Sequence, residues 1–369
     1  MSTRFATTSI AASLVTGALL CSAATPALAE STALRPKPAA RALTYTYRVA
    51  APRFLPDGTP SDARGSAAVG ISDDGRVVGN AGSGSDPVRG AAFVGDGRRN
   101  RWLAMPPAQS TGQPKVNAVA PNGLIAGYFG GPAEAITVWN RAGRPQLKPI
   151  AEGWNYGLNA AAINSRGQVV GCTSSVKTGT PVRWEADGTS TVLLMPKPGN
   201  CEMAGISESG VAVGTLHNPY YADRTLFPLP VQVTADGVRY LRTARRGAAA
   251  ASAHGISPNG RLIIGTLGSC LGKDACQPAW LSATRAPQPL RGAGRLVPTD
   301  VNDAGLVVGS AGGRAKSWQR GRLVDLTNAT RLPRGWVITS AAGVSARGEI
   351  AATAMTPAGS SVALRLSPR

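Results

Sequence analysis

The side chains best suited to acid–base chemistry are few in this sequence. Its two histidines are His217 and His254, which excludes a metal site built from several histidines. His254 and Asp300 are the candidate catalytic residues, because a His and an Asp on neighbouring strands can form a proton-transfer pair. A structural hydrogen bond or a solvated position is the plainer explanation, and we favour it.

Other signatures of chemistry are missing from the sequence. It has no nucleophile elbow, phosphate-binding loop or dinucleotide fingerprint, so we expect no cofactor. Short segments such as Ser72-Asp73-Asp74-Gly75 superficially resemble calcium loops, but they lack the regular alternation of oxygen ligands that a calcium site needs. Asp, Asn and Ser bond their own backbone in turns, so we interpret these segments as turns and expect no metal.

Aromatic side chains between predicted strands form a first set of candidate binding residues. Loop aromatics near polar side chains can stack on sugar rings or anchor peptides, and the alternative is local packing of long connections. The aromatic candidates are Trp154, Tyr156, Tyr220 and Tyr221, with His217 beside the last two. Trp336 also falls between repeats.

Basic side chains form the second set. The formal net charge of +19 favours association with polyanions, such as acidic glycans or cell-envelope polymers, although Arg-rich composition can also serve solubility alone. No nucleic-acid-binding module is recognisable, so we expect no specific nucleic-acid partner. The loop cations that we select are Arg245, Arg246, Lys273, Arg314, Arg331 and Arg334.

These candidates are distributed over a repeated pattern. The phrase AVGISDDGRVVG, residues 68–79, recurs in varied form, and its turn glycines follow one another at intervals of 43–50 residues. They are Gly75, Gly123, Gly167, Gly210, Gly260, Gly305 and Gly348. Each copy predicts strand, tight turn and strand, because glycine supplies the positive φ that the turn needs.

Two further apolar runs follow each phrase, which makes four short strands per repeat. This pattern and its period predict an all-β, seven-bladed β-propeller with four-stranded blades. Trp139, Trp184, Trp280 and Trp318 recur in the third strand, where we expect them to be packing residues. Five residues before the turn glycine, six of the seven repeats have Gly or Ala, as a crowded innermost strand requires; Asp300 is the exception.

The repeats resemble the HAF-repeat family of predicted extracellular proteins over roughly residues 44–366. Ala91-Ala92-Phe93 stands where that family has its H-A-F tripeptide, and Trp replaces the aromatic residue in four other repeats. No copy keeps the His, so no role of that residue is transferred. The resemblance implies secretion and a propeller-like fold, and it implies no established activity.

The ends of the chain have separate roles. Residues 1–29 are typical of a secretory signal peptide, with Arg4, an apolar stretch and the ending Ala27-Leu28-Ala29. Residues 30–42 are typical of a flexible lead-in. The propeller is expected over residues 43–369, with no transmembrane segment. The run Thr44 to Val49 looks like the fourth strand of an incomplete blade, so we expect it to pair with Ser361 to Leu366 and close the last blade.

An oxidising compartment permits disulfides. In a propeller, the loops between second and third strands share one side of the ring with the connections between blades. We therefore expect Cys172 to pair with Cys201, and Cys270 with Cys276.

Together these features predict a secreted, monomeric binding or scaffold protein, in the external medium or the periplasm, that recognises an acidic glycan or cell-envelope polymer through its variable loops. The alternatives are a propeller lyase or hydrolase with its site at the mouth of the ring, and an adhesion or inhibitor module that binds another protein.

Overall fold

The first two strands of every repeat form where the phrase predicts them. In the computed structural model, β2 (Ser66–Ile71) turns through Gly75 into β3 (Val77–Ala81), and the two strands pair antiparallel. The seven turn glycines have φ between +72° and +87°, a region in which a Cβ atom would be strained. The structure describes residues 44–53, 65–82, 91–104, 114–129, 136–148, 159–174, 179–193, 200–217, 228–243, 251–268 and 276–369.

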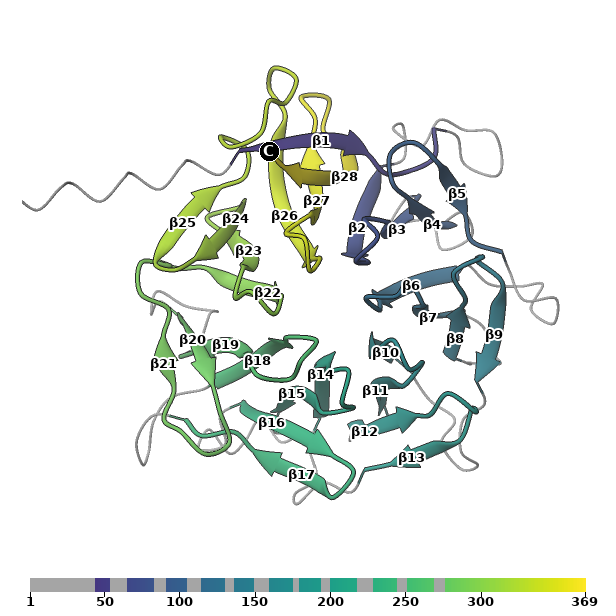
Figure 1. Ribbon diagram of the computed structural model, residues 1–369, viewed down its shortest axis with the longest axis vertical. Helices are drawn as coiled ribbons and strands as arrows, with labels where there is room; N and C mark the ends of the chain where they lie inside the picture. The colour runs from purple at the N-terminus through teal and green to yellow at the C-terminus, as the bar shows by residue number, and fades with distance from the viewer. Residues whose placement is uncertain are drawn as a thin grey trace, which may run out of the picture. The chain divides into compact units, whose positions relative to one another are not determined.

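The described strands form seven four-stranded antiparallel sheets, which are the blades of a β-propeller (Figure 1). Blade 1 continues with β4 (Ala91–Gly95) and β5 (Asn100–Trp102). Blade 2 consists of β6 (Pro114–Val119), β7 (Ile125–Phe129), β8 (Ile136–Trp139) and β9 (Pro145–Lys148). Blade 3 consists of β10 (Asn159–Ile163), β11 (Val169–Ser174), β12 (Gly179–Trp184) and β13 (Ser190–Val192).

The remaining blades have the same strand order. Blade 4 consists of β14 (Asn200–Ile206), β15 (Ala212–His217), β16 (Leu229–Thr234) and β17 (Gly237–Tyr240). Blade 5 consists of β18 (Ala251–Ile256), β19 (Ile263–Leu267), β20 (Gln277–Leu281) and β21 (Gln288–Pro289). Blade 6 consists of β22 (Val297–Val301), β23 (Val307–Ala311), β24 (Arg314–Gln319) and β25 (Arg322–Asp325). Blade 7 consists of β26 (Val337–Val344), β27 (Ile350–Met355), β28 (Ser361–Pro368) and β1 (Tyr45–Val49).

The N-terminal strand closes the ring, as the sequence predicts. β1 is the outermost strand of blade 7 and pairs antiparallel with β28, with Tyr45 opposite Pro368 and Val49 opposite Leu364. Tyr45 is 1% exposed and lies in a hydrophobic cluster that blades 6 and 7 share. Closure therefore joins strands from both ends of the propeller and covers the edge of β28.

The inner strands carry the column of small residues that the sequence indicated. In each blade the first strand has a bulge against the second, and the column residue follows the bulged residue. A Cβ atom on Gly70 would come within 2.8 Å of Val119 Cγ1, and one on Gly343 within 3.1 Å of Gly70 Cα. Neighbouring inner strands are thus too close for larger side chains here.

The core is divided among hydrophobic clusters between adjacent blades, and the tryptophans of the third strands belong to them. Trp139 and Trp184 are fully buried, and Trp318 is 7% exposed. The other three tryptophans each pair with the first residue of the second strand of their blade. In blade 5 Leu281 has that place and Trp280 lies one residue earlier, so the expectation that Trp280 shares their position is wrong. Trp280 therefore points to the other face of blade 5, where it packs edge-to-face against Trp318 at 6.0 Å.

Candidate functional site

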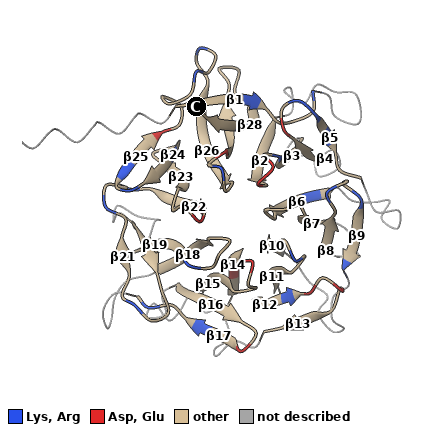
Figure 2. Ribbon diagram, viewed as in Figure 1, with Lys and Arg blue, Asp and Glu red and all other residues tan. Residues whose placement is uncertain are grey.

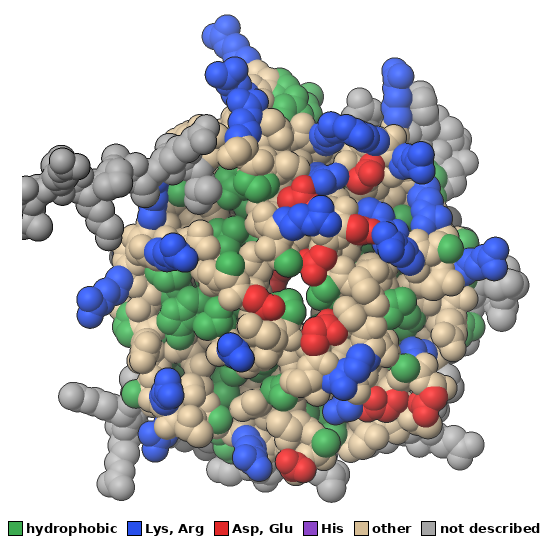
Figure 3. Space-filling model, in the orientation of Figure 1, with side chains coloured by type: hydrophobic (Ala, Val, Ile, Leu, Met, Phe, Trp, Pro, Cys, Tyr) green, Lys and Arg blue, Asp and Glu red, His purple; other side chains and the backbone are tan. Residues whose placement is uncertain are grey.

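The inner strands surround a central cavity of about 190 Å³. Its lining is mostly Gly, Ala, Val and Ile, with carboxylates contributed by Asp73, Glu208 and Asp300. Figure 3 shows acidic side chains gathered around the central opening, and Figure 2 shows basic positions farther out on the blades. A channel of negative character thus runs through a protein of positive net charge.

Asp300 is held in the channel wall by two backbone donors. The N–H of Val301 donates to Oδ1 at 2.7 Å, and the N–H of Val344 in blade 7 donates to Oδ2 at 2.8 Å. Burial raises the pKa of Asp300 to about 6, and the two backbone hydrogen bonds oppose that rise. The side chain therefore joins blades 6 and 7 and titrates near neutral pH.

His254 has a different partner from Asp300. It occupies the bulged position of β18, and its Nε2 atom lies 3.1 Å from Thr266 Oγ1 on the neighbouring strand β19. Burial lowers the pKa of His254, and the charge of Glu202 partly offsets that effect. The hydrogen bonds of the two catalytic candidates thus tie His254 within blade 5 and Asp300 to blade 7.

The structure brings both histidines of the chain close to Glu202, a residue that our sequence analysis did not select. His217 Nε2 lies 3.4 Å from Glu202 Oε2, across the β14–β15 pair of blade 4. The hydrogen bond from His217 lowers the pKa of Glu202, burial raises it, and the charges of His217 and His254 lower it further. Within the described ranges, no group of three His, Cys, Asp or Glu side chains has the geometry of a metal site.

The short turns between first and second strands, which we call the turn side, are linked around the ring. Each turn makes a hydrogen bond of 2.7–3.0 Å to the next, so all seven joints between blades are bridged. We call this set of bonds the turn ring. In order around the propeller, the bonds are Asp73 N to Pro121 O, Asn122 Nδ2 to Ser165 O, Ser165 N to Glu208 Oε1, Glu208 N to Pro258 O, Asn259 N to Asp303 Oδ1, Asn302 Nδ2 to Ser345 O, and Ala346 N to Asp73 Oδ1.

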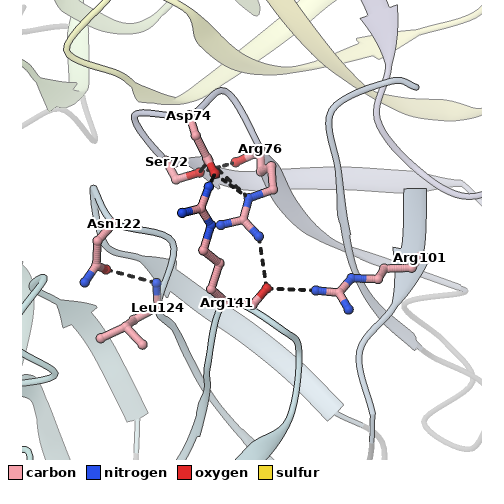
Figure 4. Close-up of polar contacts among 7 residues, drawn as sticks. All are labelled: Ser72, Asp74, Arg76, Arg101, Asn122, Leu124 and Arg141. Atoms are coloured by element: carbon pink, nitrogen blue, oxygen red, sulfur yellow. Dashed lines mark hydrogen bonds and ion pairs between the residues drawn. The ribbon is translucent and has the colours of Figure 1, made fainter. Parts of the chain in front are cut away.

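A cluster of guanidinium groups strengthens one of these joints. Asp74 accepts a hydrogen bond from Arg76 Nε at 2.9 Å and one from Arg141 at 2.8 Å, and the carbonyl of Arg141 accepts from Arg76 and Arg101 (Figure 4). Burial raises the pKa of Asp74, but the bonds from Ser72 and Arg76 and the two positive charges lower it below its ordinary value. These arginines are therefore engaged in holding blade 1 to blade 2.

The opposite side of the ring, which we call the loop side, carries the connections between blades. Seven of the eleven candidate binding residues lie outside the described residues: Trp154, Tyr156, Tyr220, Tyr221, Arg245, Arg246 and Lys273. Arg314 is described and is paired, since its Nε donates to Asp325 Oδ2 at 2.7 Å. Burial raises the pKa of Asp325, but hydrogen bonds from Arg314 and Lys316 bring it down to about 2.

Arg331 and Arg334 differ from Arg314. Both lie exposed on residues 326–336, the connection from β25 to β26, and among the described residues neither has a carboxylate partner. Trp336 ends this connection, and its ring centroid lies 6.4 Å from that of Tyr47 on β1. Our sequence analysis did not select Tyr47, because its partner is distant in the chain and only ring closure brings them together.

The disulfide predicted between the third and fourth blades is confirmed. Cys172 in β11 is bonded to Cys201 in β14, with their Cα atoms 6.0 Å apart. Cys276 is also disulfide-bonded, and Cys270, its expected partner, lies outside the described residues. No helix in the described residues is long and apolar enough to cross a membrane.

Comparison with known proteins supports the architecture. No protein-family model and no curated protein matches the chain. Among solved structures, virginiamycin B lyase from Staphylococcus aureus is 10% identical with a TM-score of 0.50, over 82% of this chain and 94% of the lyase. A streptogramin B lyase is 12% identical with a TM-score of 0.51, over 88% of this chain and 98% of that one.

A puromycin-hydrolyzing peptidase from Mycobacterium tuberculosis is also similar, at 11% identity and a TM-score of 0.56, over 86% of this chain and 55% of the peptidase. At such low identity these likenesses show the fold alone. The chain is thus a seven-bladed propeller of a shape that also occurs among lyases and peptidases, and its function must be argued from its own residues.

Proposed function

We propose that this protein is exported and acts as a rigid binding or scaffold module that holds an anionic polymer of the cell envelope on its loop side. Three features support export: the leader-like residues 1–29, the Cys172–Cys201 disulfide, and the resemblance of the repeats to extracellular HAF-repeat proteins. The formal net charge of +19 favours a polyanionic ligand.

The observation that carries the proposal is that the longer loops and two exposed arginines lie on the same side of a rigid ring. On the turn side, all seven joints are bridged, and the arginines around Asp74 are neutralised or bonded to backbone oxygens. On the loop side, Arg331 and Arg334 are exposed and unpaired within the described part of the chain. A rigid frame whose loop side carries exposed cations suits recognition by the loops on that side.

The proposal is tested with the purified chain from residue 30 onward, by measuring binding to an acidic polysaccharide and to a neutral polysaccharide of the same length. We expect binding to the acidic polymer alone, with an affinity that falls as salt is raised, because the attraction is between exposed charges. Equal binding to both polymers, or binding to neither, would contradict the proposal. Export is checked separately by sequencing the N-terminus of secreted protein, which should begin after Ala29.

A further inference from the structure

The rim of blade 7 presents aromatic rings and exposed cations together. We define the blade-7 rim site as Tyr47, Arg331, Arg334 and Trp336. It is built where the connection from blade 6 passes β1: the N–H of Tyr45 donates to Ala329 O at 2.8 Å, and Thr330 forms a β-bridge with Tyr45. Figure 1 shows this connection projecting at the rim beside β1, and Figure 2 shows basic positions along it.

The two aromatic side chains are fixed in place yet reachable from solvent. Tyr47 and Trp336 both pack against the hydrophobic cluster of blades 6 and 7, and both remain partly exposed. Their rings are inclined at 45° to each other, so they present two differently oriented faces and not one flat stack. Rigid aromatic faces that are apolar on one side and wet on the other are suited to contact with the CH groups of a sugar ring.

The two cations shortly precede Trp336 on the same connection. Residues 333–336 form a turn in which the N–H of Trp336 donates to Pro333 O at 3.2 Å, and Gly335 has a φ of +82°. This turn puts Arg334 two residues before Trp336, and Arg331 follows the Thr330 bridge to β1. Asp325, the acidic residue nearest in sequence, is already bonded to Arg314 and Lys316 and so does not neutralise them.

From this arrangement we propose that the blade-7 rim site binds a carboxylate-bearing sugar unit of an acidic polysaccharide. Trp336 and Tyr47 contact the apolar face of the sugar ring, and a guanidinium of Arg331 or Arg334 binds its carboxylate, since the two donors of a guanidinium match the two oxygens of that group. The inference rests on the proposed function and deepens it, because it names the site and the chemical class of the ligand.

The test measures binding of a short oligogalacturonate to the chain from residue 30 onward by titration calorimetry. The variants are R331A/R334A, which removes the cations, and Trp336→Leu, which keeps an apolar side chain but removes the aromatic face. The matched control is R291A/R295A, which removes two exposed arginines from the preceding connection between blades. Thermal midpoints verify that each variant is folded.

We expect R331A/R334A to weaken binding about tenfold or more, Trp336→Leu to weaken it several-fold at low and high salt alike, and R291A/R295A to change it less than about twofold. If the wild type binds and both double variants weaken the binding equally, the ligand is attracted by the general positive charge of the surface. The blade-7 rim site is then wrong, while the proposed function stands. If inorganic polyphosphate binds more tightly than oligogalacturonate and Trp336→Leu affects neither, the site holds anions without recognising sugars, and the inference is overturned. If the wild type binds no polyanion, both proposals fail.

Discussion

At the scale of single residues, the functional candidates are decided by their hydrogen-bond partners. Arg314 and Arg331 are both exposed to solvent to some degree and lie on neighbouring segments, yet Asp325 pairs with the first and not with the second. His254 is bonded to Thr266, and Asp300 to two backbone amides. Residue type identifies what a side chain can do, and these contacts decide which side chains remain free to bind a ligand.

Asp300 should make the stability of the propeller depend on pH. Its pKa of about 6 in the folded protein lies above the value of about 3.9 expected in the unfolded chain. The folded state therefore binds the proton more tightly, so the contribution of Asp300 is fully present below about pH 4 and is lost as the pH rises through 6. In D300N this dependence disappears, although one of the two backbone bonds is lost at every pH, because the amide nitrogen of Asn cannot accept it.

The measurement is urea unfolding of wild type and D300N at several pH values. We expect the stability of wild type relative to D300N to fall by about 1–3 kcal/mol between about pH 4 and pH 7. Asp236→Asn, at an exposed turn of blade 4, serves as the control. A difference between wild type and D300N that stays constant with pH would show that Asp300 is not perturbed in this way.

At the scale of secondary-structure elements, the repeated strand pair and the single closing strand have different energetic roles. Each pair of inner strands is joined by a short turn and forms locally. β1 instead pairs with a strand that lies more than 300 residues later in the chain, as the pairing of Tyr45 with Pro368 shows. The closing strand therefore contributes contacts that form only when the ring is complete.

Removing β1 should destabilise the whole domain. A chain beginning at residue 50 loses the buried ring of Tyr45 and exposes the edge of β28. A chain beginning at residue 44 keeps that ring, and β1 still covers the edge of β28. We expect the shorter chain to have a thermal midpoint lower by roughly 10 °C or more, because losing a buried aromatic side chain alone costs about 3–5 kcal/mol. A synthetic peptide of residues 44–53 should restore part of the loss. Equal midpoints for the two chains would contradict this role of β1.

At the scale of the whole molecule, the turn ring makes the propeller a closed circle of hydrogen bonds in addition to a closed circle of packed blades. Asp73 closes the joint between blades 7 and 1, and Asp303 closes the joint between blades 5 and 6, each by accepting a backbone N–H. The two bonds have lengths of 2.7 Å and 2.9 Å. Their similar geometry suggests that each joint contributes comparably.

Asp73→Ala and Asp303→Ala should each lower the free energy of unfolding by about 0.5–1.5 kcal/mol, the range for a hydrogen bond that is partly open to water. Asp236→Ala removes the same kind of side chain outside the turn ring and should cost less than about 0.5 kcal/mol. The check is denaturant unfolding of the three variants in one buffer. If the ring variants are no less stable than Asp236→Ala, the turn ring does not contribute to stability.

The sequence by itself determined the parts of this protein that depend on short spans of chain. The turn glycines such as Gly75 and the four strands of each blade were predictable, because turn conformation and strand pattern are local and recur in every repeat. The Cys172–Cys201 pairing followed from the propeller topology that those repeats predict. Ring closure by β1 followed from counting strands at the two ends.

Only the tertiary structure decided which side chains meet between blades. Strand register turned Trp280 to the face of blade 5 opposite to the one that Trp318 occupies in blade 6. The packing of blade 4 against blade 5 brought the charge of Glu202 close to His254. Ring closure placed Tyr47 beside Trp336. These contacts depend on register, twist and the approach of segments far apart in the chain, and a pattern of residue types repeated along the sequence does not specify them.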